Sequence, residues 1–213
     1  MQGKFIIWEG IDGCGKSTQF LKAANYIFKK SKKNYILLTR EPTYRKYGTM
    51  IRELLSKDTE PEANAEKYLE LYLKDRQDHL QNLILPNLKQ GTIVLCDRFM
   101  YSTFAYQKAQ GNDLQKIIKL HAKVQKPDLV LLIDCPAELA MQRSAIDNER
   151  KKITGNFKNE KFEKTGFLEK ARQNYLELPK LLPDHNIKVI DGSKSIEEVW
   201  IQVQKELDLL FKN

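Results

Sequence analysis

The sequence predicts an α/β fold built on a mostly parallel sheet. Short apolar runs of strand length recur along the 213 residues, and longer segments with helical spacing separate them. Such alternation is typical of βαβ units, in which a helix connects two parallel strands. The length and the 41% hydrophobic share suit one ordinary domain. The expected strands are Phe5–Trp8, Tyr35–Leu38, Ile93–Cys96, Leu129–Ile133 and Val189–Ile190.

Apolar residues at helical spacing predict helices between these strands. One segment, Ser144–Lys161, is highly charged and has little apolar periodicity, so we expect a mobile flap or a disordered loop there. It would form a lid inserted into a single domain, 1–213. The expected helices are Lys16–Lys30, Thr49–Leu55, Ala63–Leu83, Tyr101–Lys108, Leu114–Val124, Ala137–Ser144, Phe162–Leu181 and Ile196–Leu210.

Charge and cysteine usage narrow the class of protein. Lys and Arg exceed Asp and Glu by 36 to 28, which fits a basic surface, an acidic small substrate or nucleic acid. Cys14, Cys96 and Cys135 are odd in number and far apart, which favours a reduced protein over a disulfide scaffold or a metal site. No leader peptide and no membrane-spanning run are visible in the sequence. We therefore expect a cytoplasmic protein without a membrane partner.

The stretch Gly10–Ser17 reads GIDGCGKS and matches the phosphate-loop pattern G-x-x-x-x-G-K-[ST]. It follows an expected strand and opens an expected helix, as the pattern requires. Glycines let backbone N–H groups approach a phosphate, Lys16 adds a charge, and the Ser17 hydroxyl suits Mg²⁺. GTPases, motor ATPases and small-molecule kinases share this loop, so it leaves the reaction open. The residues expected to bind the nucleotide are Gly10, Ile11, Asp12, Gly13, Cys14, Gly15, Lys16, Ser17 and Thr18.

Asp97 and Arg98 directly follow the expected strand Ile93–Cys96. In a parallel sheet both residues emerge at the carboxyl edge, near the phosphate loop. Asp97 could hold Mg²⁺ or orient an attacking oxygen, and Arg98 could grip an acceptor phosphate. The structural alternative is a helix cap at Asp97 that pairs with Arg98.

Several segments, in order, resemble the thymidylate kinases. Glu9–Thr18 resembles the phosphate loop of that family, and Asp97–Gln107 resembles its D-R-[YH]-x-x-S-x-x-A-Y-Q motif. The resemblance continues through TREPTYRKYGTMIRELL, AEKYLELYLKDRQDHL, KPDLVLLID and FLEKARQNYLEL, and so covers essentially the whole chain. It implies a three-layer phosphate-loop fold with a five-stranded parallel sheet. It also implies transfer of the γ-phosphoryl group of ATP to dTMP, with Mg²⁺, by a homodimer.

The resemblance implies roles for individual side chains. Arg98 and Arg52 should hold the dTMP phosphate, and Asp12 falls where the family places an acid near the 3′-hydroxyl. Tyr72 takes the place of the aromatic that stacks on the base, and Arg76 that of the donor to the thymine carbonyl. The expected substrate-binding residues are Asp12, Glu41, Pro42, Arg52, Tyr72, Arg76, Arg98, Thr103, Tyr106 and Gln107, with Tyr106 beside the sugar 2′ carbon.

The same resemblance implies which residues take part in phosphoryl transfer. Gly13 stands where one branch of the family places a catalytic Arg, so the lid should supply that cation, first from Arg150 and second from Arg143. A solvated basic loop is an equally good interpretation of the lid charges. The expected catalytic residues are Lys16, Asp97, Arg98 and Arg150, and the expected Mg²⁺ ligands are Ser17 and Asp97.

Some positions depart from the family pattern. Thr43-Tyr44-Arg45 replaces Gly-Gly-Thr, where Arg45 could bind phosphate, and Phe99 replaces a Tyr or His. Leu73 and Lys74 replace two small residues and could narrow the base pocket, so a pyrimidine (deoxy)nucleoside monophosphate kinase of broader specificity is the alternative. A nucleotide-binding switch or nucleic-acid-binding ATPase is less favoured, because no basic stripe with interleaved aromatics is visible. We expect no nucleic-acid partner.

Overall fold

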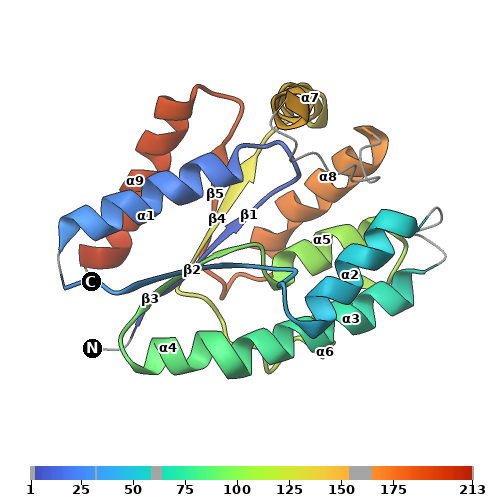
Figure 1. Ribbon diagram of the computed structural model, residues 1–213, viewed down its shortest axis with the longest axis horizontal. Coiled ribbons are helices and arrows are strands. Elements are labelled where there is room, and N and C mark those ends of the chain that lie inside the picture. The colour runs from blue at the N-terminus through green and yellow to red at the C-terminus, as the bar shows by residue number, and fades with distance from the viewer. Residues whose placement is uncertain (1–2, 32, 59–63, 154–164, 213) are drawn as a thin grey trace.

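A computed structural model of the chain describes residues 3–31, 33–58, 64–153 and 165–212. The described residues form one parallel sheet of five strands in the order β2-β3-β1-β4-β5 (Figure 1). The expected α/β class and five-stranded parallel sheet are confirmed. The strands are β1 (Phe5–Glu9), β2 (Ile36–Arg40), β3 (Ile93–Asp97), β4 (Leu129–Asp134) and β5 (Ile187–Asp191).

The central strands read as continuous apolar runs because both of their faces are covered. All five residues of β1 are buried, whereas the edge strands β2 and β5 are largely half-buried or exposed. In the register of the sheet, Trp8 pairs with Asp97 and Glu9 pairs with Leu132. The loop after β1 and the residues after β3 therefore leave the carboxyl edge of the sheet side by side.

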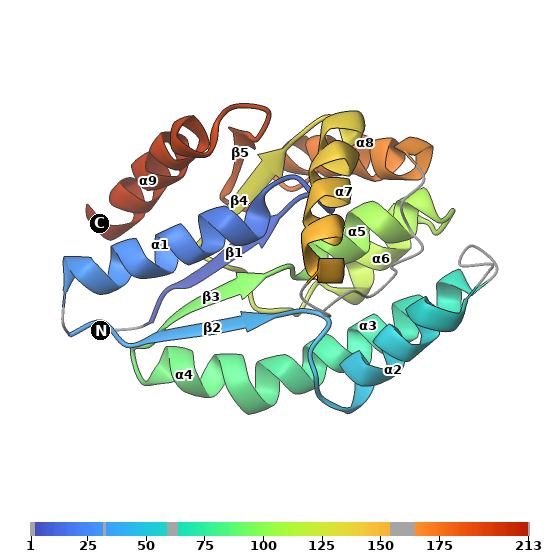
Figure 2. The same cartoon turned by 45° about the horizontal axis from the view of Figure 1, so that its top comes forward.

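Helices cover both faces of the sheet. In Figures 1 and 2, α1 and α9 pack against each other on one face, and α4, α5 and α8 lie on the other. The N-terminal half of α7 lies beside the phosphate loop (Figure 2). The helices are α1 (Lys16–Lys30), α2 (Lys46–Lys57), α3 (Ala65–His79), α4 (Leu85–Lys89), α5 (Met100–Ala109), α6 (Leu114–Leu120), α7 (Ala137–Ile153), α8 (Thr165–Leu181) and α9 (Ile196–Lys212).

The expected helix Ala63–Leu83 is longer at its C-terminal end than the sequence predicts. A π-helical turn, η1 (Leu80–Ile84), joins α3 to α4 without a break in the helical path. Pro86 lies in the first turn of α4, lacks an N–H, and would clash with a carbonyl of a regular α-helix at that depth. The wider π turn before Pro86 accommodates this residue.

The expectation of a loop over Ser144–Lys161 is wrong for its first part. Helix α7 continues through residue 153. Glu, Arg and Lys are good helix formers, so a charged segment can stay helical without an apolar face. Residues 154–161, and 162–164 of the expected helix Phe162–Leu181, lie outside the described residues. None of the described helices is long and apolar enough to cross a bilayer.

Gly48 allows the first turn of α2 to pack on the loop before it. A Cβ at Gly48 would lie 2.0 Å from the carbonyl oxygen of Thr43. Gly48→Ala should therefore displace backbone and lower the free energy of unfolding by about 1–3 kcal/mol, measured by urea denaturation. Gly166→Ala is the matched control, because no described atom lies within 4 Å of its added Cβ. Equal stability of the two variants would contradict the packing.

Candidate active site

The phosphate loop is pressed against its neighbours and can be formed only by glycine at two of its turns. Gly10 and Gly13 have φ values of 136° and 77°. A Cβ at Gly13 would lie 2.1 Å from the carbonyl oxygen of Ala140 in α7, and one at Gly10 would lie 2.4 Å from that of Ile133 in β4. The loop therefore runs tightly across the end of β4 and under the start of α7.

Lys16 carries a buried positive charge in this loop. Its Nζ donates to the carbonyl oxygens of Gly10 at 2.9 Å and Ile11 at 2.7 Å, and the residue is 6% exposed. No side chain among the described residues caps the N-terminus of α1, while Ser17 and Thr18 are exposed there. Uncapped N–H groups at a helix N-terminus, next to an ammonium, form an anion site.

Arg98 connects β3 to this loop. Its backbone N–H bonds the carbonyl of Trp8 at 2.9 Å, and its φ of 73° is unusual for a residue other than glycine. Its Nη2 lies 2.6 Å from Oδ1 of Asp12, while its Nη1 donates to Ser102 Oγ at 2.9 Å and to the Tyr175 hydroxyl at 3.2 Å. The structure thus brings the two predicted residues Asp12 and Arg98 into direct contact.

Asp12 is held as a carboxylate. Its partial burial alone would raise its pKa, but the charges of Arg98 and Lys16 oppose this, as do hydrogen bonds from Arg98 and from Tyr106, whose hydroxyl lies 3.2 Å from Oδ2. Together they lower the pKa of Asp12 to about 2. The Tyr106 ring also lies beside the Arg98 guanidinium, at 5.4 Å. Asp12, Arg98 and Tyr106 therefore form one cluster.

Glu9 supports this cluster from behind and was not a predicted site residue. It is fully buried at the end of β1 and accepts hydrogen bonds from the Phe99 N–H at 2.8 Å, Ser102 Oγ at 2.6 Å and the Tyr175 hydroxyl at 3.0 Å. Burial raises the pKa of Glu9, although these bonds oppose the shift. The sequence pattern that could have identified Glu9 is an acidic residue at the end of an apolar run, directly before the phosphate loop. Ser102 and Tyr175, which both donate to Glu9, also accept hydrogen bonds from Arg98, so they connect Glu9 to Arg98.

A second buried cluster surrounds Arg76 of α3, which is 2% exposed. Its Nε and Nη2 donate to Glu41 Oε2 at 2.9 and 2.6 Å, and Nη2 also donates to Thr103 at 3.1 Å. Its Nη1 lies 2.7 Å from Nε2 of His121. His79 binds the other oxygen of Glu41 at 3.0 Å. The predicted residues Glu41, Arg76 and Thr103 meet here, and the two histidines are additions that no motif announced.

The comparisons with known proteins agree on one family. A family model described as thymidylate kinase matches residues 8–203. The chain belongs to the thymidylate kinase family. It is 34% identical over 203 residues to a probable thymidylate kinase of Pyrococcus horikoshii, covering 93% of each chain. It is 38% identical over 212 residues to a thymidylate kinase of Desulfotalea psychrophila, covering 99% of this chain and 96% of the relative. The resemblance inferred from the motifs is confirmed.

Three residues that depart from the thymidylate kinase pattern, Thr43, Arg45 and Lys74, each bind a carboxylate of α3. Thr43 donates through its N–H and hydroxyl to the buried Asp75 at 2.8 and 2.5 Å. Arg45 pairs with Asp78, and Lys74 donates to Glu70 at 2.5 Å on the exposed side of α3. Thus neither Arg45 nor Lys74 joins the two clusters.

Two further departures pack against the arginines. The Phe99 ring is fully buried 5.1 Å from the guanidinium of Arg76. The Tyr44 ring is 4.2 Å from the guanidinium of Arg52, whose Nη2 donates to the carbonyl of Pro42. Arg52 and Pro42, both predicted to be near the substrate, are therefore in contact.

The remaining predicted substrate residues divide into two groups. Tyr72 is half-buried, and burial raises its pKa to about 12, while the charges of Arg98 and Asp12 act on it from nearby. Gln107, in contrast, donates to Gln110 at 2.6 Å and accepts from Asn112 at 2.8 Å at the end of α5. The structure brings Tyr72 toward the Arg98 cluster, whereas the hydrogen bonds of Gln107 go to residues at the end of α5.

Arg150 and Arg143 are the two candidates for the lid cation, and the structure describes the side chain of Arg143 alone. The side chain of Arg150 lies outside the described residues, so its catalytic assignment stays a prediction. Arg143 donates through Nη1 to the carbonyl of Gly192 at 2.7 Å and through Nη2 to that of Ser193 at 3.3 Å. Arg143 therefore fastens α7 to the loop between β5 and α9.

Asp97 and Ser17 are compatible with Mg²⁺. Oδ1 of Asp97 is buried and has no hydrogen-bond partner among the described residues, and Ser17 is exposed at the start of α1. The described part of the chain contains no group of three or more His, Cys, Asp or Glu able to hold a metal. Mg²⁺ at phosphates needs only one or two protein ligands and completes its shell with phosphate and water oxygens. The two residues fit such a site.

The pKa of Asp12 gives a pH test of the Asp12 and Arg98 contact. Because the folded pKa lies below the ordinary value, the pair stabilises the protein above about pH 4 and loses this effect as the pH falls toward about 2. Asp12→Asn should lower the free energy of unfolding at neutral pH by less than about 1 kcal/mol, since the Asp12 side chain is half exposed. Urea unfolding of both proteins should show this difference shrinking on acidification. A difference that is independent of pH would contradict the pairing.

Proposed function

We propose that the chain transfers the γ-phosphoryl group of ATP to dTMP, giving ADP and dTDP. One observation carries the proposal: Arg98 bonds Asp12 of the phosphate loop at 2.6 Å, in a chain of the thymidylate kinase family. This contact supports an acceptor-phosphate role for Arg98, because it holds the guanidinium against a loop suited to a donor phosphate. Close approach of two polyanions requires such a cation.

The donor side consists of the phosphate loop. Lys16 and the N-terminal N–H groups of α1 would hold the β- and γ-phosphates of ATP. The Lys16 ammonium already lies inside the loop on the carbonyls of Gly10 and Ile11, so little side-chain ordering is needed when phosphate binds. Lys16 would exchange these carbonyls, and Cys14 Sγ at 3.8 Å, for phosphate oxygens when ATP binds, so that its charge is in place before transfer begins.

The acceptor side begins at the phosphate of dTMP. Arg98 and Arg52 would bind it, since a planar guanidinium matches the oxygens of a phosphate better than an ammonium does. Asp12 would accept a hydrogen bond from the 3′-hydroxyl of dTMP while it also binds Arg98. Tyr106 would lie beside the sugar 2′ carbon. The 3.2 Å bond between Tyr106 and Asp12 supports this pairing of sugar contacts.

The base side lies on α3 and α5. Tyr72 would stack on the thymine ring, and Arg76 would donate to a thymine carbonyl beside Thr103. Glu41 neutralises Arg76 in the buried cluster, so the arginine can stay charged there at low energetic cost. Gln107 would read the base edge with the amide N–H and the oxygen lone pair that its bonds to Gln110 and Asn112 leave over.

Ser17 and Asp97 would hold Mg²⁺, which supplies charge neutralisation between the β- and γ-phosphates when bound. Arg150 would add the lid cation over the transferred phosphoryl group. The family resemblance also supports a homodimer in the cytoplasm, and light scattering on the purified protein tests the dimer. The outward contact of Lys74 with Glu70 takes Lys74 away from the base pocket, which leaves the half-buried Leu73 as the departure that could narrow it.

Steady-state kinetics test the proposal. With ATP, Mg²⁺ and dTMP, the wild-type protein should release ADP, and Lys16→Ala should lose most of its kcat because the donor phosphate loses its charge partner. Arg98→Ala should raise KM for dTMP by about tenfold or more, since a charged hydrogen-bond partner is lost. Arg45→Ala, which removes an exposed arginine paired with Asp78, is the control and should stay near wild type.

Two outcomes would contradict the proposal. Absence of ADP release above background with wild-type protein would reject the reaction. Equal KM values for dTMP in Arg98→Ala and wild type would remove Arg98 from the acceptor site.

A further inference from the structure

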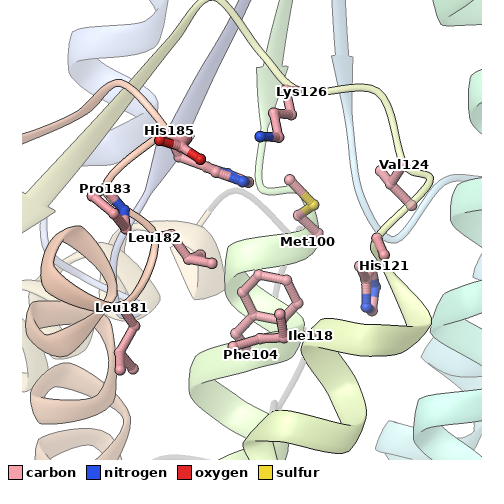
Figure 3. Close-up of a pocket in the computed structure, with 12 residues that line it drawn as sticks. Met100, Phe104, Ile118, His121, Val124, Lys126, Leu181, Leu182, Pro183 and His185 are labelled. Atoms are coloured by element: carbon pink, nitrogen blue, oxygen red, sulfur yellow. The ribbon is translucent and has the colours of Figure 1, made fainter.

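A cavity of about 270 Å³ lies behind the Arg76 cluster. Figure 3 shows it between α5, the loop after α6 and the loop after α8. Met100, Phe104 and Ile118 contribute apolar walls, and Lys126 and His185 come from the two loops. His121 also lines this cavity, and it is the lining residue that bonds Arg76. The cavity therefore reaches His121, the partner of a predicted substrate residue.

The contacts of His121 determine its tautomer. Its Nδ1 lies 2.8 Å from the carbonyl oxygen of Ile117, which can only accept, so Nδ1 carries the proton. Nε2 is then an acceptor and receives the Nη1 hydrogen of Arg76 at 2.7 Å. Burial and the charge of Arg76 lower the pKa of His121 to about 3, so the imidazole is neutral under ordinary assay conditions. His121 is thus a fixed neutral acceptor.

Arg76 has five N–H groups in one plane. Nε uses one on Glu41, Nη2 uses two on Glu41 and Thr103, and Nη1 uses one on His121. Among the described contacts, the second Nη1 hydrogen is the one left for a ligand. Because the guanidinium is planar, bonds at all three nitrogens fix the direction of that last N–H. The bond to His121 is made by Nη1, the same nitrogen that carries the remaining N–H.

We propose that His121 is a positioning residue for the acceptor site, holding Arg76 so that its remaining N–H meets a carbonyl of the pyrimidine base. This inference rests on the proposed phosphorylation of dTMP. His121 touches neither phosphate site, so it acts on the binding of dTMP and leaves the binding of ATP alone. A residue with a merely structural role would instead change both KM values together.

The first test removes the acceptor and keeps side-chain bulk. His121→Leu should raise KM for dTMP by about tenfold, because a buried charged donor loses its partner. Its KM for ATP and its kcat should stay within about twofold of wild type. His121→Gln, whose side-chain oxygen can accept from Arg76, should recover part of the loss. Ile118→Ala is the control, since it alters the same cavity without touching the bond to Arg76.

The cavity allows a second test by chemical rescue. His121 is the C-cap residue of α6 and has a φ of −99°, which glycine can adopt. His121→Gly should therefore fold and leave a space beside the cavity. Added imidazole should enter this space and lower KM for dTMP in a saturable way, while it leaves wild type and Ile118→Ala unchanged. This variant and His121→Gln decide the question if His121→Leu does not fold.

Three results would overturn the inference. They are an unchanged KM for dTMP in His121→Leu, an equal rise of both KM values, and a KM of His121→Gly that imidazole does not lower. In each case the wild-type protein still phosphorylates dTMP, so only the role of His121 is lost. Wild-type protein that releases no ADP with dTMP would overturn the proposed function itself and this inference with it.

Discussion

Arg98 reaches Asp12 because β1 and β3 are neighbours in the sheet and end in register at its carboxyl edge. The pair joins the phosphate loop to the residues that follow β3, where the proposed donor and acceptor sides meet. The backbone of Arg98 adopts a φ of 73°, which a nonglycine residue adopts only when its surroundings determine it. Glu9, through Ser102 and Tyr175, supplies those surroundings. The site is thus held by side chains that come from β1, α5 and α8.

Buried charge is costly, and this protein compensates it locally. The pair of Glu41 and Arg76 is almost completely buried, and every hydrogen bond named for it goes to another polar group of the same cluster. A buried ion pair often adds little net stability compared with an apolar pair of the same size. Its benefit here is geometric, because a bonded guanidinium has one orientation. Removing a single partner would leave an uncompensated charge and would loosen the side chains proposed to face the substrate.

The sequence predicts those parts of the fold that depend on local pattern. Apolar runs identified all five strands, and the glycines with Lys16 identified the phosphate loop, because backbone geometry requires these residue types there. Glu9, His79 and His121 could not be found in the same way. Each is a single polar residue whose partners lie far away in the chain, so only the packed fold brings them together. The resemblance to thymidylate kinases placed Arg76 and Arg98 but carried no information about what orients them.

We propose that Asp12 and Arg98 work as one unit in the use of dTMP. A double-mutant cycle on kcat/KM for dTMP, with Asp12→Asn, Arg98→Lys and the double variant, measures this directly. We expect the double variant to lose less than the sum of the single losses, with a coupling energy of at least about 1 kcal/mol. Additive losses, within about 0.3 kcal/mol, would show that the two residues act independently and would contradict their coupling.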